Sequence, residues 1–122
     1  MTAQLKDILA PLTEMQSVIG VMIIDQDGLV MENTFPEDQD TDLLGSIYAI
    51  LELNVQGQLV KLGESANQIF FSTDEKLILV QKIEDVILVL YTQKNNLDEL
   101  QSRLLSVARQ IVQFLHMSSQ GA

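Results

Sequence analysis

The alternation of apolar and polar positions predicts one helix and a strand hairpin in the first part of the chain. Apolar residues recur at spacings of three and four over residues 3–16, which is typical of a helix with one buried face. Residues 17–25 are β-branched and almost entirely apolar, as expected of a strand buried on both sides. Gly28 can supply the positive φ of a tight turn, after which residues 29–34 return as an edge strand.

The longest predicted element is a helix from Asp40 to Leu62, which is apolar around more of its circumference than one buried face requires. At about 100° per residue, one stripe for packing on a sheet contains Leu43, Leu44, Ile47, Tyr48, Leu51, Val55, Leu59 and Leu62. A second stripe, roughly opposite, contains Ala49, Leu53 and Val60, with Gly45, Ser46 and Gly57 among or beside them. A helix that packs by one face only should be polar on the other. The second stripe therefore predicts a second apolar contact.

The ends of this helix have recognisable capping residues. Asp40 or Thr41 is the expected N-cap, and the acidic residues around it suit the positive end of the helix dipole. Gly63 is the expected C-terminal glycine.

The remainder of the chain predicts three strands and a last helix. Residues 65–73, 77–83 and 86–92 are separated by short polar turns, which indicates an antiparallel meander. The last of these strands is apolar on both sides and is expected in the middle of the sheet. Asn95 or Asn96 can cap a helix over residues 97–117, and residues 118–122 are expected to be a frayed tail. The packing stripe of that helix comprises Leu97, Leu100, Leu104, Ala108, Ile111, Val112 and Leu115.

These elements predict a single domain over residues 1–122, in the order helix-β-β-helix-β-β-β-helix. Strands buried on both faces require helices on both faces. The expected fold is a three-layer α/β/α sandwich (α+β), with a five-stranded, mostly antiparallel sheet. The central helix is expected on one side of the sheet and the terminal helices on the other.

Composition narrows the classes of partner. The net charge of −10 and a pI near 4.2 disfavour binding to nucleic acid or to an anionic membrane surface. No apolar run approaches the roughly 20 residues of a membrane-spanning helix, and we expect no secretory signal and no direct insertion into a membrane. The chain has no cysteine, which favours a cytoplasmic location.

Residues able to carry chemistry are few. His116 is the only histidine and lies near the end of the last helix, where it also suits the helix dipole. Asp25 and Asp27 beside Gly28 resemble part of a calcium loop, but the other ligands are missing and a hairpin turn is the better interpretation. Gly57 and Gly63 flank a lysine without forming a phosphate-binding motif. We therefore expect no enzyme activity, no cofactor and no metal.

The ordered set of elements resembles the Roadblock/dynein-light-chain family in its small prokaryotic form. The likeness is carried by the hairpin VIGVMIIDQDGLVMENT (18–34), the wide helix 43–62, the strand VILVLY (86–91) and the start of the last helix at NNLDEL (95–100). It extends from about Leu5 to Leu115.

The resemblance implies a homodimer, or a heterodimer with a Roadblock paralogue. In such a dimer two central helices pack antiparallel and the third strands pair across the two-fold axis. Family members commonly regulate or scaffold small Ras-like GTPases without catalysing a reaction, and some stimulate GTP hydrolysis by the partner. The implied interface residues are Gly45, Ser46, Ala49, Leu53, Gln56, Gly57, Val60, Gln68 and Phe70. Neither Arg103 nor Arg109 resembles an arginine finger, because both lie on the last helix at positions expected to be solvated.

Two other functions remain open at this point. A small-ligand sensor is possible because related profilin-like folds can hold a ligand against the sheet, and the five methionines could line such a pocket. An enzyme is the least favoured of the three.

Overall fold

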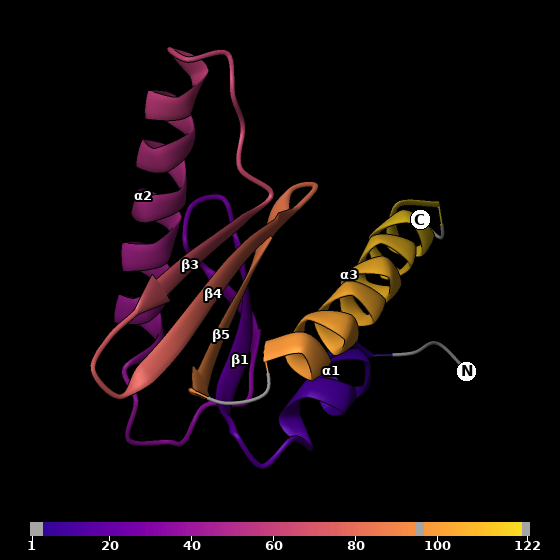
Figure 1. Ribbon diagram of the computed structural model, residues 1–122. Helices are drawn as coiled ribbons and strands as arrows, with labels where there is room; N and C mark the ends of the chain where they lie inside the picture. The colour runs from indigo at the N-terminus through magenta and orange to yellow at the C-terminus, as the bar shows by residue number, and fades with distance from the viewer. Residues whose placement is uncertain (1–3, 95–96, 121–122) are drawn as a thin grey trace.

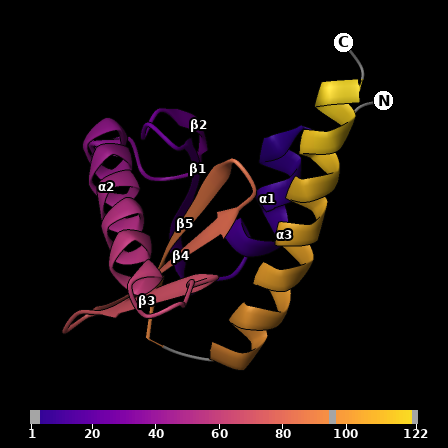
Figure 2. The same ribbon diagram turned by 90° about the horizontal axis from the view of Figure 1, so that it is seen from above.

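The computed structural model describes residues 4–94 and 97–120. The elements follow the predicted order: α1 (Leu5–Thr13), β1 (Val18–Asp25), β2 (Val30–Asn33), α2 (Thr41–Val60), β3 (Gln68–Ser72), β4 (Lys76–Ile83), β5 (Val86–Gln93) and α3 (Leu97–Gln120). Helix α2 covers one face of the sheet, and α1 and α3 cover the other (Figures 1 and 2). The predicted three-layer α/β/α sandwich is confirmed.

The five strands form one antiparallel sheet in the order β2-β1-β5-β4-β3. Strand β5 lies at the centre and β2 at an edge, as predicted. Strand β3 forms the other edge and, within residues 4–94 and 97–120, pairs only with β4. One side of β3 is therefore open to a further strand.

Two apolar cores lie on the two faces of the sheet. Successive residues of a strand point to opposite faces, so in β1 Val21 and Ile23 join the core with α1 and α3, whereas Met22 and Ile24 join the core with α2. All four side chains are completely buried. This double burial explains why the run from Val18 to Asp25 is almost uninterruptedly apolar.

The predicted hairpin turn is confirmed. Gly28 adopts a φ of +89°, and the Oδ1 atom of Asp25 accepts hydrogen bonds from the backbone N–H groups of Asp27 at 2.9 Å and Leu29 at 3.0 Å. The Asp25 carboxylate is thus used by the turn itself.

Some predicted boundaries differ from the structure. Helix α1 is shorter than residues 3–16. Helix α3 continues past Met117 to Gln120, so the tail predicted from residue 118 is helical as far as residue 120. The proposed caps Asn95 and Asn96, and the last two residues, 121–122, lie outside the described residues.

Candidate interaction surface

Helix α2 is bounded by the capping interactions that its sequence predicts. The Oδ1 atom of Asp40 accepts a hydrogen bond from the N–H of Leu43 at 3.1 Å, so Asp40 rather than Thr41 is the N-cap. At the other end Gly63 has a φ of +72°. The N–H groups of Gly63 and Glu64 bond to the carbonyls of Val60 and Leu59, which is a Schellman motif.

The inner face of α2 combines small residues, Tyr48 and Glu52 with the half-buried Leu44 and Leu51, and the predicted packing of Leu44, Tyr48 and Leu51 on the sheet side is confirmed. Gly45, Tyr48, Ala49 and Glu52 are the buried residues of the helix. The hydroxyl of Tyr48 lies 2.5 Å from that of Tyr91 on β5. Burial raises the pKa of the Tyr48 hydroxyl well above its usual value, and the hydrogen bond and charge of Tyr91 act in the same direction.

The predicted division of α2 into two stripes is wrong in two respects. Gly45 and Ala49, expected on the side away from the sheet, are buried against it, whereas Leu43, Ile47 and Leu62 of the expected packing stripe are exposed. The reason is the hairpin turn, which approaches so closely that a Cβ at Gly45 would collide with the carbonyl oxygen of Gly28. Small residues have to face the sheet at this end of the helix.

The outward side of α2 is apolar along most of its length. We define the outer face as Leu43, Ser46, Ile47, Ile50, Leu53, Gly57 and Val60, all of which are exposed. Leu53 and Val60 are each 72% exposed and Ile50 is 58% exposed. The apolar periodicity of the sequence does not identify Leu43, Ile47 and Ile50 as surface residues. All three lie on the side of the helix opposite Tyr48 and Glu52, and this shared position could have identified them as surface residues.

Among the glycines of the described helices, Gly57 is the one at which no contact within the chain requires the absence of a side chain. A Cβ at this position would meet no atom within 4 Å, and Gly57 has no positive φ. By contrast, Gly45 is held by its contact with Gly28. A glycine inside a helix costs about 1 kcal/mol relative to alanine. The presence of Gly57 is therefore explained if the backbone of another protein packs closely against the outer face at this point.

The other predicted interface residues lie elsewhere. Gln56 is half-buried and turned toward the connection between α2 and β3, where it bonds to Ala66. Gln68 and Phe70 lie on β3. Phe71, which follows Phe70, points to the opposite face of the strand and packs into the core under α2, so Gln68 and Phe70 face away from α2. Gln68 donates to Gln81 at 3.0 Å, and Phe70 is 42% exposed.

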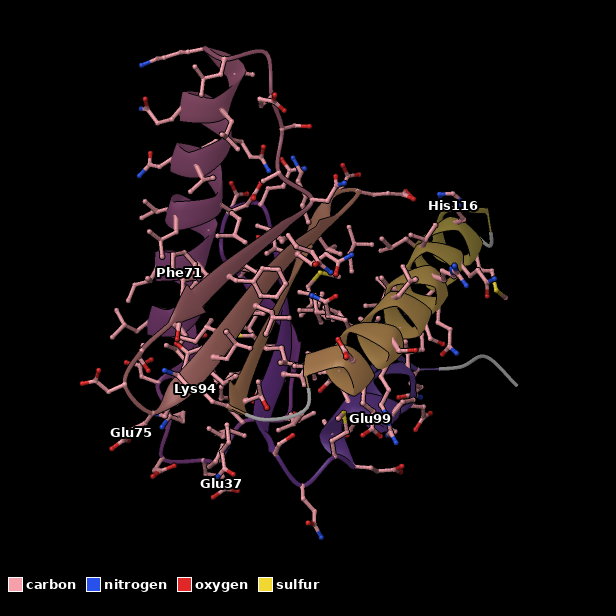
Figure 3. All side chains as sticks on the ribbon, viewed as in Figure 1. Glu37, Phe71, Glu75, Lys94, Glu99 and His116 are labelled. Carbon is pink, nitrogen blue, oxygen red and sulfur yellow. The ribbon has the colours of Figure 1, made fainter. Side chains whose placement is uncertain are left out.

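Charge is unevenly distributed along α2. Asp40 and Asp42 lie at its N-terminal end, and the preceding loop adds Glu37 and Asp38. Figure 3 shows Glu37 and Glu75 at the end of the molecule where α2 begins. Lys61 follows the last residue of the helix. The outer face thus runs from a strongly acidic end to an end that has one lysine, Lys61, and one glutamate, Glu64.

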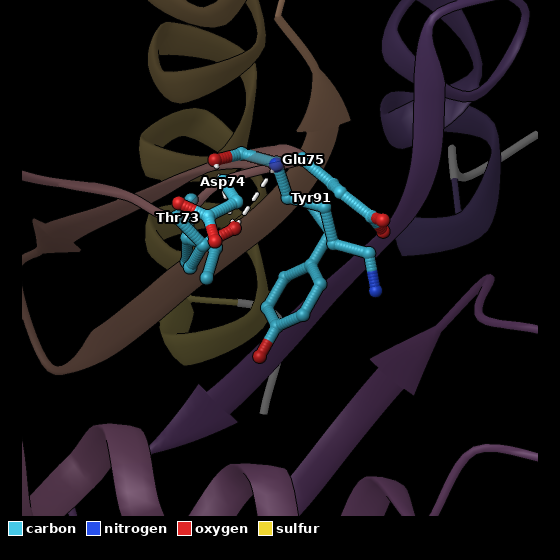
Figure 4. Close-up of a pocket in the computed structure, with 6 residues that line it drawn as sticks. Thr73, Asp74, Glu75 and Tyr91 are labelled. Carbon is cyan, nitrogen blue, oxygen red and sulfur yellow. Dashed lines mark hydrogen bonds between the residues drawn. The ribbon is translucent and has the colours of Figure 1, made fainter.

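An open depression of about 460 Å³ lies beside the turn between β3 and β4 (Figure 4). Its lining consists of Thr73, Asp74, Glu75, Lys76, Ile78 and Tyr91. The methionines are elsewhere: Met22 is completely buried in the core, and Met31 and Met117 are exposed. Met15 is half-buried against the core with α1 and α3, so none of the described methionines lines this depression. Within residues 4–94 and 97–120, no group of three or more His, Asp or Glu side chains is placed to hold a metal ion.

Comparison with known proteins identifies the family. A sequence model of the Roadblock/LC7 domain matches residues 4–92. Uncharacterized protein MJ0311 of Methanocaldococcus jannaschii is 28% identical over 95 residues, which cover 75% of this chain and 86% of that protein.

None of the described helices combines the length and apolarity needed to cross a membrane.

Solved structures share the fold at low sequence identity. MglB of Myxococcus xanthus superimposes with a TM-score of 0.80 at 15% identity, covering 89% of each chain. An MglB with a tetrameric arrangement gives a TM-score of 0.81 at 19% identity, covering 90% of this chain and 86% of that one. Because the family model matches residues 4–92, which is most of the chain, the chain belongs to the Roadblock/LC7 family.

Proposed function

We propose that this chain is a non-catalytic, dimeric regulator or scaffold of a small Ras-like GTPase. The observation that carries the proposal is the outer face of α2, where exposed apolar side chains follow one another along the helix. A contiguous apolar patch of this kind is typical of a protein–protein interaction site.

A second copy of the chain is the proposed occupant of the outer face. Because Gly57 has no side chain, the backbone of a second helix can approach α2 closely at this position. Such close packing of two helices favours glycine over alanine on a helix surface. An antiparallel pair of α2 helices places the acidic start of each helix near Lys61 of its partner, whereas a parallel pair brings the acidic ends together. Charge complementarity therefore favours the antiparallel arrangement. A heterodimer with a Roadblock paralogue would use the same surface.

The free edge of β3 extends the proposed interface. Strand β3 is the next element after α2, and none of the described strands pairs with its outer side. Pairing of two such strands across a two-fold axis would satisfy their open backbone groups and join the two sheets.

The GTPase partner is proposed from family membership. Residues 4–92 match the Roadblock/LC7 domain, and the family resemblance implies regulation of small Ras-like GTPases. Arg103 is unsuited to act as an arginine finger, because its guanidinium donates to the Pro11 carbonyl and pairs with Glu99. Arg109 is exposed, but it lies on α3, on the other side of the sheet from the outer face of α2. Stimulation of hydrolysis through the outer face would therefore act by ordering the GTPase's own catalytic groups.

Two measurements test the proposal. Light scattering across a dilution series should give twice the 13.6 kDa mass of one chain, and a monomer at every concentration would contradict the dimer. Calorimetric titration with a small Ras-like GTPase, loaded with a non-hydrolysable GTP analogue or with GDP, should show saturable binding that depends on the nucleotide. Hydrolysis rates measured with and without the dimer then separate stimulation from tethering.

The alternative, a small-ligand sensor, has one observation in its favour, the open depression beside Tyr91. Its polar lining, broad opening and lack of methionines make it a weaker candidate than the outer face. A thermal-shift screen that returned a specific, saturable ligand, together with loss of the shift in Tyr91→Ala, would favour the sensor.

A further inference from the structure

The connection between α2 and β3 is held by one side chain. Gln56 forms two hydrogen bonds with the backbone of Ala66: its Nε2 donates to the Ala66 carbonyl at 2.6 Å, and its Oε1 accepts from the Ala66 N–H at 3.1 Å. This is the pattern with which a residue of a neighbouring strand would pair. A side-chain amide thus takes the place of a backbone partner.

A buried carboxylate orients this amide. The second N–H of the Gln56 Nε2 donates to the Oε2 atom of Glu52, one turn earlier on α2, at 3.2 Å. Glu52 is only 5% exposed. Since both N–H groups and the carbonyl oxygen of Gln56 are engaged, the amide has one favourable orientation. We refer to Glu52, Gln56 and Ala66 as the amide clamp.

The clamp acts where the structure offers few other constraints. The last turns of α2 extend beyond the ends of the strands, and the connection runs back alongside them to β3 (Figure 1). The Schellman motif ends at Glu64. Outside the helices and strands, no backbone–backbone hydrogen bond among the described residues involves Ser65, Ala66 or Asn67.

We propose that Gln56 is a positioning residue that holds the outer face of α2 and the free edge of β3 in a fixed relation. The inference rests on the proposed function, because those are the two parts of the proposed dimer interface. The amide of Gln56 is engaged by Ala66 and Glu52, so we expect Gln56 to act through the connection rather than through contact with the partner. It lowers the conformational entropy lost when both parts engage a second copy at once.

Gln56→Ala tests the clamp, with Gln58→Ala as the matched control. Gln58 lies two residues further along the same helix and is exposed. Among the described residues, only Lys61 donates a hydrogen bond to it. The same substitution therefore changes helix propensity equally at both sites. The first readout is hydrogen exchange of the Ala66 amide by NMR, and the second is the dissociation constant of the dimer.

In Gln56→Ala we expect the Ala66 amide to exchange about fivefold to tenfold faster, and the dimer dissociation constant to rise by a similar factor, since about 1 kcal/mol is lost per hydrogen bond. Exchange of the Val89 amide in central β5 should not change, which shows that the fold is intact. Gln58→Ala should alter neither readout.

Gln56→Glu gives an independent test. It retains an acceptor but removes both donors and sets a second carboxylate beside Glu52, so its effects should exceed those of Gln56→Ala. Adding Glu52→Gln restores a donor–acceptor pair between the two positions and should recover part of the loss.

The outcomes distinguish the clamp from the proposed function. Unchanged Ala66 exchange in Gln56→Ala would overturn the clamp. Faster exchange with an unchanged dissociation constant would overturn the positioning role. A wild-type chain that stays monomeric would overturn the proposed dimer, while Ala66 exchange would still decide whether the clamp exists.

Discussion

Gly28 and Gly45 lie in contact, backbone against backbone. The first is in the turn between β1 and β2, and the second is in the first half of α2. A Cβ added to Gly45 would collide with the Gly28 carbonyl oxygen, and one added to Gly28 would lie 2.9 Å from the Gly45 carbonyl oxygen. This contact sets which side of α2 faces the sheet, and hence which residues form the outer face.

Gly45→Ala should destabilise the folded chain. Alanine is favoured in a helix by about 1 kcal/mol, but the collision with Gly28 should outweigh this gain and leave a net loss of about 1–3 kcal/mol. The free energy of unfolding in urea measures the effect. A stabilised variant would show that the hairpin can move away without cost.

Gly57→Ala should have the opposite effect on the isolated chain. A Cβ at this position meets nothing within 4 Å, so the monomer should gain about 0.5–1 kcal/mol. The dimer should weaken, because the new methyl group separates the paired helices. Urea unfolding at low concentration and sedimentation across a dilution series measure the two effects separately. If the dimer were unaffected, Gly57 would lie outside the interface.

Leu53→Glu should weaken dimerisation with little change in the fold. Leu53 is 72% exposed, and surface substitutions of this kind usually alter stability by about 0.5 kcal/mol or less. In a symmetric dimer two charges would be buried close together, which should raise the dissociation constant on the order of 100-fold. Light scattering provides the measurement. Leu105→Glu, at an exposed leucine of α3, is the control and should leave the dimer intact.

Arg103→Gln should loosen the contact between the terminal helices. The Arg103 guanidinium donates to the Pro11 carbonyl at 2.9 Å and to Glu99 at 3.0 Å, and it lies favourably at the C-terminal end of α1. Because Arg103 is 40% exposed, we expect a loss of only about 1 kcal/mol. Arg109→Gln, at an exposed position on α3, should be nearly neutral in the same unfolding experiment.

Tyr48 should make the fold sensitive to alkaline pH. Its pKa is raised above the ordinary value of 10.0, first by burial and then by the hydrogen bond to Tyr91. The folded state therefore binds the Tyr48 proton more tightly than the unfolded state does. This contribution is complete below pH 10.0 and decreases as the pH rises above that value. Unfolding free energies measured up to pH about 11 should fall less steeply for Tyr48→Phe than for the wild type; equal slopes would contradict the assignment.

Much of the fold could be predicted because its signals are local. Apolar runs such as Val18–Asp25 identify strands by their composition, and Asp25, Gly28, Asp40 and Gly63 mark turns and helix ends through their own backbone preferences. Burial on both sides of β1 and β5 then requires helices on both faces of the sheet. The layered architecture follows from these requirements.

The orientation of α2 could not be predicted in the same way. Its circumference is apolar nearly all round, so periodicity gives no single direction. Helical periodicity predicts Leu43 and Ile47 on the sheet side because they adjoin the stripe that contains Leu44 and Tyr48. The close approach of Gly28 leaves no room for a side chain at Gly45, and the hydroxyl of Tyr48 on the same side of the helix bonds to that of Tyr91.

The amide clamp was hidden for a related reason. Gln56 was predicted at the partner interface, and nothing in the residues around it indicates that its side chain pairs with Ala66, ten positions later.

The amino-acid sequence by itself determined the elements, their order and the three-layer fold, because each depends on short-range preferences and on the need to bury apolar strands. Only the tertiary structure decided which residues of α2 face outward, because that depends on how closely the hairpin turn packs against the helix.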